Sequence, residues 1–170
     1  MTVRVRPAEP RDAAAIRAVH LAAFPTAVEA DLVGRLDAGR DSVVSLAVDA
    51  DGELVGHVLL SRMRVSGDGR EFRALGLGPV GVIPGHQGAG LGAALIGGAL
   101  AIARATGEEL VFVLGEPDYY RRFGFSAAAA APFASPYAGP YFMALALSPD
   151  LKLPVAGQAA YAKAFGDIAA

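Results

Sequence analysis

The residues that point most clearly to a chemical role are three glycines at alternate positions, Gly88, Gly90 and Gly92. A strand pattern ends at Pro84, and a helical pattern begins within 88–92. Glycine has no Cβ to keep a ligand away from the backbone. The first N–H groups of a helix lack partners inside it and lie at the positive end of its dipole. The segment therefore predicts a cradle for a phosphate or diphosphate, with a flexible glycine loop before a weak helix as the structural alternative.

Two common phosphate ligands fit this segment poorly. A nucleoside triphosphate loop ends in Gly-Lys-Ser/Thr, and the segment contains no lysine. The residues from Gly88 to Ala93 match the dinucleotide fingerprint G-x-G-x-x-A, but that fingerprint opens a doubly wound domain and is followed about 20 residues later by an acid that closes the next strand. Here Glu108 and Glu109 precede the next strand, and three antiparallel strands are expected before the loop. An NAD(P)-binding protein is therefore kept only as a second alternative.

The spacing around the glycines resembles the acyl-CoA motif of the GNAT superfamily of N-acetyltransferases. The matching pattern is Val82-x-Pro84-x-x-Gln87-x-x-Gly90-x-Gly92. Downstream, Tyr120-Arg-Arg-Phe-Gly-Phe125 is similar to the Y-x-x-x-G-F of the same family, and the order of elements from Val3 to Leu147 also fits, so the resemblance covers nearly the whole chain. Further similarity to the bacterial YhbS-like branch lies in Gly56-His57, in Leu-Gly-Glu-Pro-Asp-Tyr-Tyr, and in a tail with Tyr161 and Phe165.

The resemblance implies an α+β fold with a mixed sheet of about six or seven strands and about four helices. It also implies direct transfer of an acetyl group from acetyl-CoA to an amine in a ternary complex, with a catalytically silent acyl-CoA-binding module as the alternative. Two family positions differ here: a frequent Arg or Lys is Ala89, and a common Asn is Val113. The cofactor-binding residues that it implies are Val80, Gly81, Val82, Gln87, Gly88, Ala89, Gly90, Leu91 and Gly92.

A tyrosine is the expected general acid. Tyrosine has an ordinary pKa near 10, so it is protonated at neutral pH and can give a proton to a leaving thiolate. The family motif places this role on Tyr120, with Tyr119 as the alternative. Spacing alone would favour an aromatic packing role for this pair. Arg121 and Arg122 could contact a phosphate or an acidic substrate, but a solvated helix face is the simpler interpretation.

The general base is not identified by the sequence. A carboxylate that some relatives carry on the fourth strand would fall near Gly76. Phe24 and Glu29 are predicted to contact the acceptor, whose surface is expected over 24–36 and 133–141. Each of the possible bases also has a structural interpretation, such as a capping box between Thr26 and Glu29. The candidates are Glu29, Glu71, His57 and Glu116.

The periodicity of the chain indicates how these residues are positioned. Helical patterns follow Pro10 and Thr26, and a third runs from Gly88 to Gly107 between two strands, which must then be parallel neighbours. The run of alanines at 127–131 is expected to be a loop or the edge of a strand. Strand patterns cover 3–6, 43–49, 54–65, 72–83, 110–114 and 141–147, and the second, third and fourth of them are joined by tight turns such as Asp51-Gly52.

Composition narrows the class of protein. The 170 residues suit one domain, and the resemblance implies an acetyltransferase domain at 1–148 with a tail at 149–170 packed on it. Fifteen basic and seventeen acidic residues give a net charge of −2, which argues against nucleic acid or an anionic membrane as partner. No apolar run is long enough to span a bilayer, so we expect a cytoplasmic protein. We expect no metal and a small-molecule or peptide amine as acceptor; a homodimer is the candidate assembly, and the sequence leaves the oligomeric state open.

Overall fold

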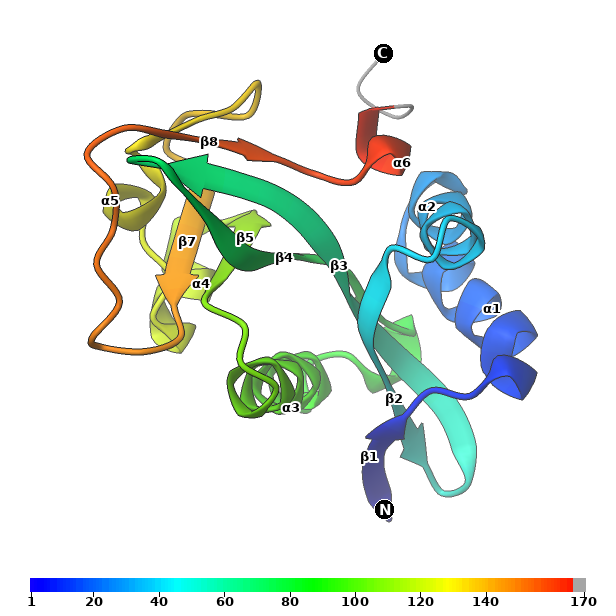
Figure 1. Ribbon diagram of the computed structural model, residues 1–170. Helices are drawn as coiled ribbons and strands as arrows, with labels where there is room; N and C mark the ends of the chain where they lie inside the picture. The colour runs from blue at the N-terminus through cyan, green and yellow to red at the C-terminus, as the bar shows by residue number, and fades with distance from the viewer. Residues whose placement is uncertain (167–170) are drawn as a thin grey trace.

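The computed structural model describes residues 1–166, in which helices and strands are interspersed along the chain (Figure 1). The helices are α1 (Ala13–Ala23), α2 (Val28–Ala38), α3 (Leu91–Ala105), α4 (Pro117–Tyr120), α5 (Ala127–Ala130) and α6 (Lys163–Gly166). The strands are β1 (Val3–Pro7), β2 (Ser42–Ala50), β3 (Glu53–Gly67), β4 (Arg70–Val82), β5 (Leu110–Leu114), β6 (Phe133–Ala134), β7 (Phe142–Ala146) and β8 (Gly157–Ala160). None of the helices described in 1–166 is long and apolar enough to cross a membrane.

The strands form one mixed sheet in the order β1-β2-β3-β4-β5-β7. Only β4 and β5 are parallel in this path, because α3 carries the chain from one to the other; the remaining neighbours are antiparallel. This confirms the α+β class and the single βαβ unit. The described chain has two short strands more than the six clear strand patterns in the sequence, and one of them, β8, pairs with β3 where β2 has ended.

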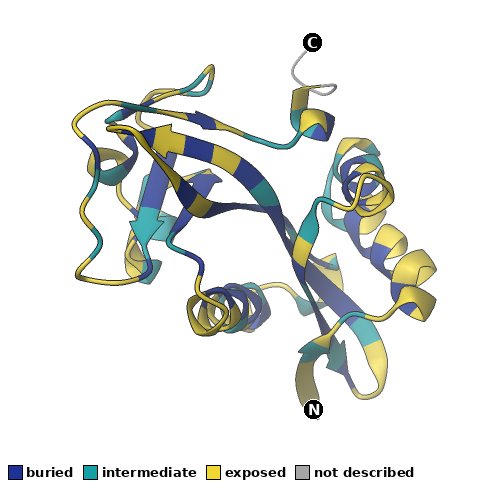
Figure 2. Ribbon diagram, in the orientation of Figure 1, coloured by how far each residue is buried: buried dark blue, intermediate teal, exposed yellow. Residues whose placement is uncertain are grey.

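Helices cover both faces of the sheet (Figure 1). On one face α3 buries Leu95, Ile96 and Ala99 against strand residues such as Val58 and Val111. On the other, α1 and α2 pack with Leu59 and with α6, and their buried sides face inward while the outer sides are exposed (Figure 2). Each fully buried aliphatic side chain contributes roughly 1.5–3 kcal/mol to the folded state. The two helical layers therefore fix β4 and the segment that follows it from both sides.

The alanine run is a short helix, which corrects the expectation of loop or strand edge at 127–131. Ser126 is its N-cap, and the backbone N–H of Ala129 donates to the Ser126 Oγ at 3.1 Å. A capping serine before residues of the highest helix propensity favours a helical turn. This helix places Ala130 against the aromatic cluster of Phe112, Phe133 and Phe142.

Candidate functional site

The strands β4 and β5 separate before β4 ends. Their pairing runs from Ala74 with Leu110 to Leu77 with Val113, whereas β4 continues to Val82. The N–H of Ile83 donates to Val55 on the β3 side. Successive backbone N–H groups of a strand point to opposite edges, so those of Val80 and Val82 point to the open edge and that of Gly81 to β3. Two backbone donors are thus presented where β5 has left the sheet.

The glycine loop follows this open edge. Gly88 and Gly90 have φ of +81° and +79°, the left-handed region that side chains disfavour, and Gly90 is the N-cap of α3. A Cβ at either glycine would point into open space rather than against protein. A cavity of about 390 Å³, here called the loop cavity, lies over this helix start. It is lined by Val82, His86, Gln87, Gly88, Gly90, Leu91, Gly92, Ala93, Tyr119 and Arg122.

Two side chains shape the loop cavity in ways that the sequence left open. The Nε2 of Gln87 donates to the carbonyl of Val82 at 2.8 Å, so this side chain holds the loop to the strand. Ala89 is exposed and brings no charge. Arg122 reaches the cavity from the other side, with its guanidinium 4.2 Å from the centre of the Tyr119 ring. Arg122 is thus the one arginine or lysine among the described residues that line the loop cavity.

A second cavity, of about 260 Å³, lies beside the open edge of β4 and is here called the chamber. Val80 lines the chamber, and Val82 two residues later lines the loop cavity, so one strand segment connects the two. The chamber is lined by Phe24, Glu29, Leu32, Leu77, Gly78, Pro79, Val80, Leu114, Tyr120, Tyr161 and Phe165.

The two neighbouring tyrosines face different cavities. Tyr120 lines the chamber and Tyr119 the loop cavity. The Tyr120 ring packs over Gly115, where an added Cβ would come within 2.3 Å of it, and edge-on against Phe125 at 5.9 Å. Burial, with a smaller effect from Tyr119, raises the pKa of Tyr120 to about 12. Tyr120 is therefore a protonated hydroxyl group at neutral pH beside the open edge of β4.

Glu29 and Tyr161 bring two unsatisfied polar atoms to the chamber. The Oε1 of Glu29 and the hydroxyl of Tyr161 are buried, and neither has a hydrogen-bond partner in the described part of the chain. The expected capping box is not formed: the N-cap of α2 is Ala27, and Thr26 only approaches the N–H of Val28 at 3.4 Å. Glu29 is consequently turned to the chamber instead of the helix end.

His57 is a buried, hydrogen-bonded histidine. Its Nδ1 lies 2.9 Å from the Nε2 of His20 and its Nε2 lies 2.8 Å from the Oγ of Ser45. Burial lowers the pKa of His20 to about 4 and that of His57 to about 3. A Cβ at Gly81 would come 3.0 Å from His20 Nδ1, so the glycine makes room for this pair. Both ring nitrogens of His57 are occupied, and it does not line the chamber.

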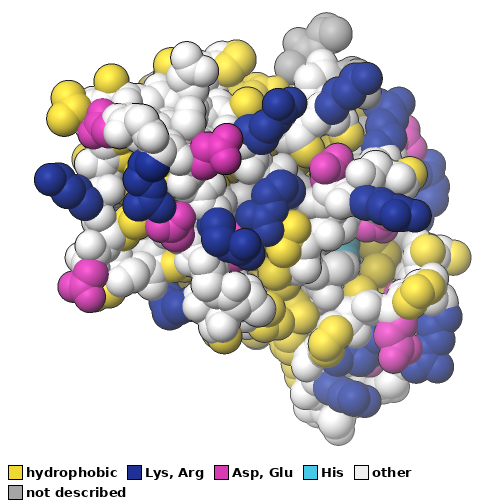
Figure 3. All heavy atoms as spheres, viewed as in Figure 1, with side chains coloured by type: hydrophobic (Ala, Val, Ile, Leu, Met, Phe, Trp, Pro, Cys, Tyr) yellow, Lys and Arg dark blue, Asp and Glu magenta, His cyan; other side chains and the backbone are white. Residues whose placement is uncertain are grey.

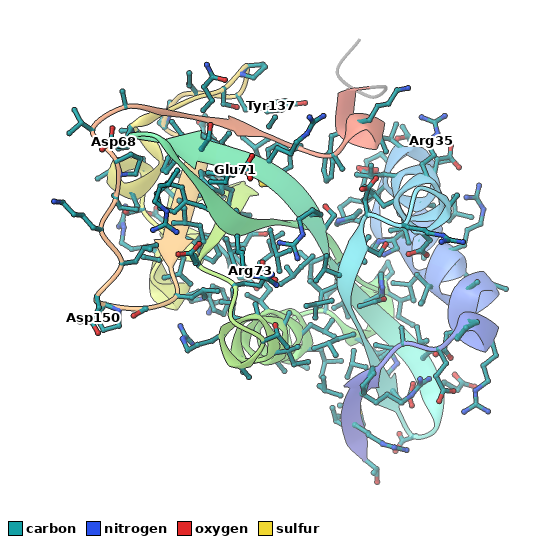
Figure 4. The ribbon with its side chains drawn as sticks, in the orientation of Figure 1. Arg35, Asp68, Glu71, Arg73, Tyr137 and Asp150 are labelled. Atoms are coloured by element: carbon teal, nitrogen blue, oxygen red, sulfur yellow. The ribbon has the colours of Figure 1, made fainter. Side chains whose placement is uncertain are left out.

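The other possible bases lie outside the chamber. Glu71 and Arg73 are on the first part of β4, beside the end of β3 that pairs with β8, and lie away from α2 and its Arg35 (Figure 4). Glu116 is exposed ahead of α4. Of the two segments expected at the acceptor surface, 24–36 reaches the chamber through Phe24, Glu29 and Leu32, whereas Phe133 and the residues after it line a separate cavity near α5. The tail residues Tyr161 and Phe165 also line the chamber.

The part of the chain in 1–166 brings together no group of three or more histidine, aspartate or glutamate side chains that could hold a metal ion. On the face seen in Figure 3, positive and negative side chains are interspersed. The site is thus built from backbone donors, one arginine, tyrosine hydroxyls and one carboxylate.

A mixed sheet that opens after β4, with a glycine loop leading into the crossover helix, is the arrangement of an acyl-CoA N-acyltransferase fold. The model of the acetyltransferase (GNAT) domain family matches residues 4–128, and the chain belongs to this family. It is 39% identical over 120 residues to the uncharacterized N-acetyltransferase YjhQ of Escherichia coli K12. The match covers 69% of this chain and 66% of YjhQ, slightly under two thirds of that relative's length.

Two solved structures have the same fold over almost the whole chain. The GNAT family N-acetyltransferase YhbS from Escherichia coli, in complex with CoA, superposes with a TM-score of 0.85 at 27% identity, covering 96% of this chain and 92% of that one. A GNAT family acetyltransferase from Brucella melitensis, in complex with acetyl-CoA, has a TM-score of 0.78 at 36% identity, covering 96% and 98%. The predicted family and fold are confirmed.

Proposed function

We propose that this protein transfers an acetyl group from acetyl-CoA directly to an amine, with both substrates bound at once. One arrangement carries the proposal: Val80 lines a chamber that holds a protonated tyrosine, Val82 lines the cavity of about 390 Å³ at a helix start, and their N–H groups face an edge of β4 with which no described strand pairs. A pantetheine arm along this edge would join the two cavities. The complexes of the two relatives with CoA and acetyl-CoA agree with this reading.

The residues of the loop fit the diphosphate of coenzyme A. Gly88 and Gly90 leave open space above left-handed backbone, and the first N–H groups of α3 point to it. Gln87 fixes the loop through Val82, while Ala89, Leu91 and Gly92 offer backbone only. Arg122 adds a positive charge from the side of α4. We propose Val80 and Val82 as donors to the arm, and Gly81 as the residue that gives His20 its space.

When bound, acetyl-CoA supplies an acyl thioester, whose carbonyl carbon accepts the amine and whose carbon–sulfur bond breaks. The open edge of β4 aligns the reactants, and a free N–H there stabilises negative charge on the carbonyl oxygen. Tyr120 gives its proton to the departing sulfur. An ammonium acceptor loses one proton to solvent before attack, and the second proton, lost as the amide forms, restores Tyr120. The products are an N-acetyl amine, a free thiol and one proton.

We also infer that residues 149–166 belong to the same domain as 1–148. β8 pairs with β3, and Ala159 and Ala164 are buried in the main clusters. The last four residues of the expected tail, 167–170, lie outside the described residues.

The proposal is tested by calorimetry with acetyl-CoA and NADH, followed by thiol release over a panel of primary amines. Tight acetyl-CoA binding with amine-dependent thiol release is the expected result. Binding without release for any amine would indicate a silent acyl-CoA-binding module. Preference for NADH would overturn the proposal.

A further inference from the structure

The chamber has an unusual balance of groups for an acyl acceptor site. Among its lining residues in the described chain there is one carboxylate, Glu29, and no arginine or lysine. The two hydroxyl groups belong to Tyr120 and Tyr161, and the remaining walls are apolar. A site of this kind attracts a positive or neutral ligand and gives an anionic group no counter-charge.

Within residues 1–166, two buried atoms of this chamber lack hydrogen-bond partners, and both are able to accept a hydrogen bond from an ammonium. Leaving a buried polar atom unsatisfied destabilises the folded state. The Oε1 of Glu29 and the hydroxyl of Tyr161 are such atoms, contributed by elements more than a hundred residues apart in the chain. A ligand that donates hydrogen bonds in the chamber would remove this cost.

The tail holds Tyr161 in place through packing. Its ring fills the space over Gly76, where an added Cβ would come within 2.6 Å. Tyr137 lies edge-on at 5.5 Å and Phe165 at 4.7 Å between ring centres. The hydroxyl is therefore fixed by three neighbours rather than free to turn to solvent, and burial raises the pKa of Tyr161 above its ordinary value.

We infer that the acceptor is a small primary amine with an apolar body and no acid group, whose ammonium is bound by Glu29 and the Tyr161 hydroxyl. This rests on the proposed function and names its substrate class. Phe24, Leu32 and Phe165 form the apolar surface for the body of the amine. The volume of about 260 Å³ suits an alkylamine or arylalkylamine. Amino acids are disfavoured by their carboxylate, and polyamines by a second charge against apolar walls.

The test compares three amines that differ in charge: phenethylamine, phenylalanine and spermidine. Calorimetry measures their binding to the protein with and without CoA, and thiol release measures kcat/KM. We expect phenethylamine to exceed each of the others by at least about tenfold in binding and in kcat/KM, since the unpaired charge costs at least about 1.4 kcal/mol. Equal or better binding of phenylalanine or spermidine would overturn the inference.

Variants separate this inference from the proposed function. Glu29→Gln is expected to weaken the binding of phenethylamine about 10- to 100-fold, because a hydrogen bond to a charged group is worth about 1.5–3 kcal/mol. The binding of acetyl-CoA is expected to stay unchanged. Tyr161→Phe is expected to have a smaller effect in the same direction. Glu53→Gln, an exposed carboxylate in the β2–β3 hairpin, is the control. Unchanged amine binding in Glu29→Gln would refute the substrate class, whereas failure of acetyl-CoA to bind would refute the proposed function.

Discussion

The loop cavity and the chamber lie one after the other along the same strand, but they are built in opposite ways. The loop cavity takes most of its lining from one continuous segment, 82–93, in which a Cβ at Gly88 or Gly90 would meet open space. The chamber uses side chains from α1, α2, β4, α4 and the tail, from Phe24 to Phe165. On the proposed function, the comparison teaches that the cofactor is recognised through local backbone geometry and the acceptor through tertiary packing, so the second can change while the first is kept.

The largest expected effect separates chemistry in the chamber from binding in the loop cavity. Tyr120→Phe keeps the ring but removes the hydroxyl that protonates sulfur, and general acid catalysis contributes about 10²–10⁴-fold. We expect kcat to fall by at least about 100-fold with the dissociation constant of acetyl-CoA unchanged. Stopped-flow thiol release and calorimetry measure the two quantities. Loss of less than about threefold in kcat would remove Tyr120 from the mechanism and would point to Tyr119, tested by the same substitution.

Substitution of a glycine that lines neither cavity is expected to lower activity through the chamber alone. Gly115→Ala forces the Tyr120 ring to move, because the new Cβ would lie within 2.3 Å of it. Misplacement of a catalytic group by about 1 Å costs up to about 100-fold, so we expect a loss in kcat of about 10- to 100-fold. Gly34→Ala is the matched control, since a Cβ on that exposed face of α2 meets nothing within 4 Å. An active Gly115→Ala variant would show that the position of the ring is not critical.

Two adjacent arginines test the other side of the comparison. Arg122→Ala removes the cation of the loop cavity, and we expect acetyl-CoA to bind about tenfold more weakly, or about 1.4 kcal/mol, with less dependence on salt. The amine KM should not change. Arg121→Ala is the control, because that side chain is exposed and pairs with Asp118 at 3.3 Å. Equal effects of the two substitutions would mean that only the total positive charge just after α4 matters, and not the position of Arg122 in the loop cavity.

The smallest effect concerns the histidine pair beneath the strand that both cavities share. His20 and His57 have their pKa lowered to about 4 and about 3, mainly by burial, from an ordinary value of 6.5. Below pH 6.5 the unfolded chain therefore binds protons that the folded state does not, and stability falls as the pH falls toward 4. We expect a loss on the order of 1 kcal/mol between pH 7 and pH 6 in urea unfolding. A flat profile over this interval would contradict burial of the neutral pair.

Most of the fold and half of the site could be predicted from sequence for a physical reason. The βαβ unit and the glycine loop depend on local periodicity and on residues that need a particular backbone. Glu29 was predicted to contact the acceptor. Only the structure shows that Thr26 and Glu29 form no capping box and that Glu29 lines the chamber instead. Tyr161 and Arg122 reach the cavities because segments that are far apart in the sequence meet in the fold. The spacing of residues along the chain does not predict such contacts. The one sequence signal for the tail was the similarity of its Tyr161 and Phe165 to the YhbS-like branch. The contact of Tyr161 with Gly76 is seen only in the structure.

The pairing of β8 with the free half of β3 has a consequence for a shortened chain. The wall that carries Tyr161 and Phe165 follows β8, the last strand in the described residues. Every residue that lines the loop cavity lies before β8 in the chain. On the proposed function, a chain cut short before β8 keeps all the residues of the diphosphate site and loses side chains that would select the amine.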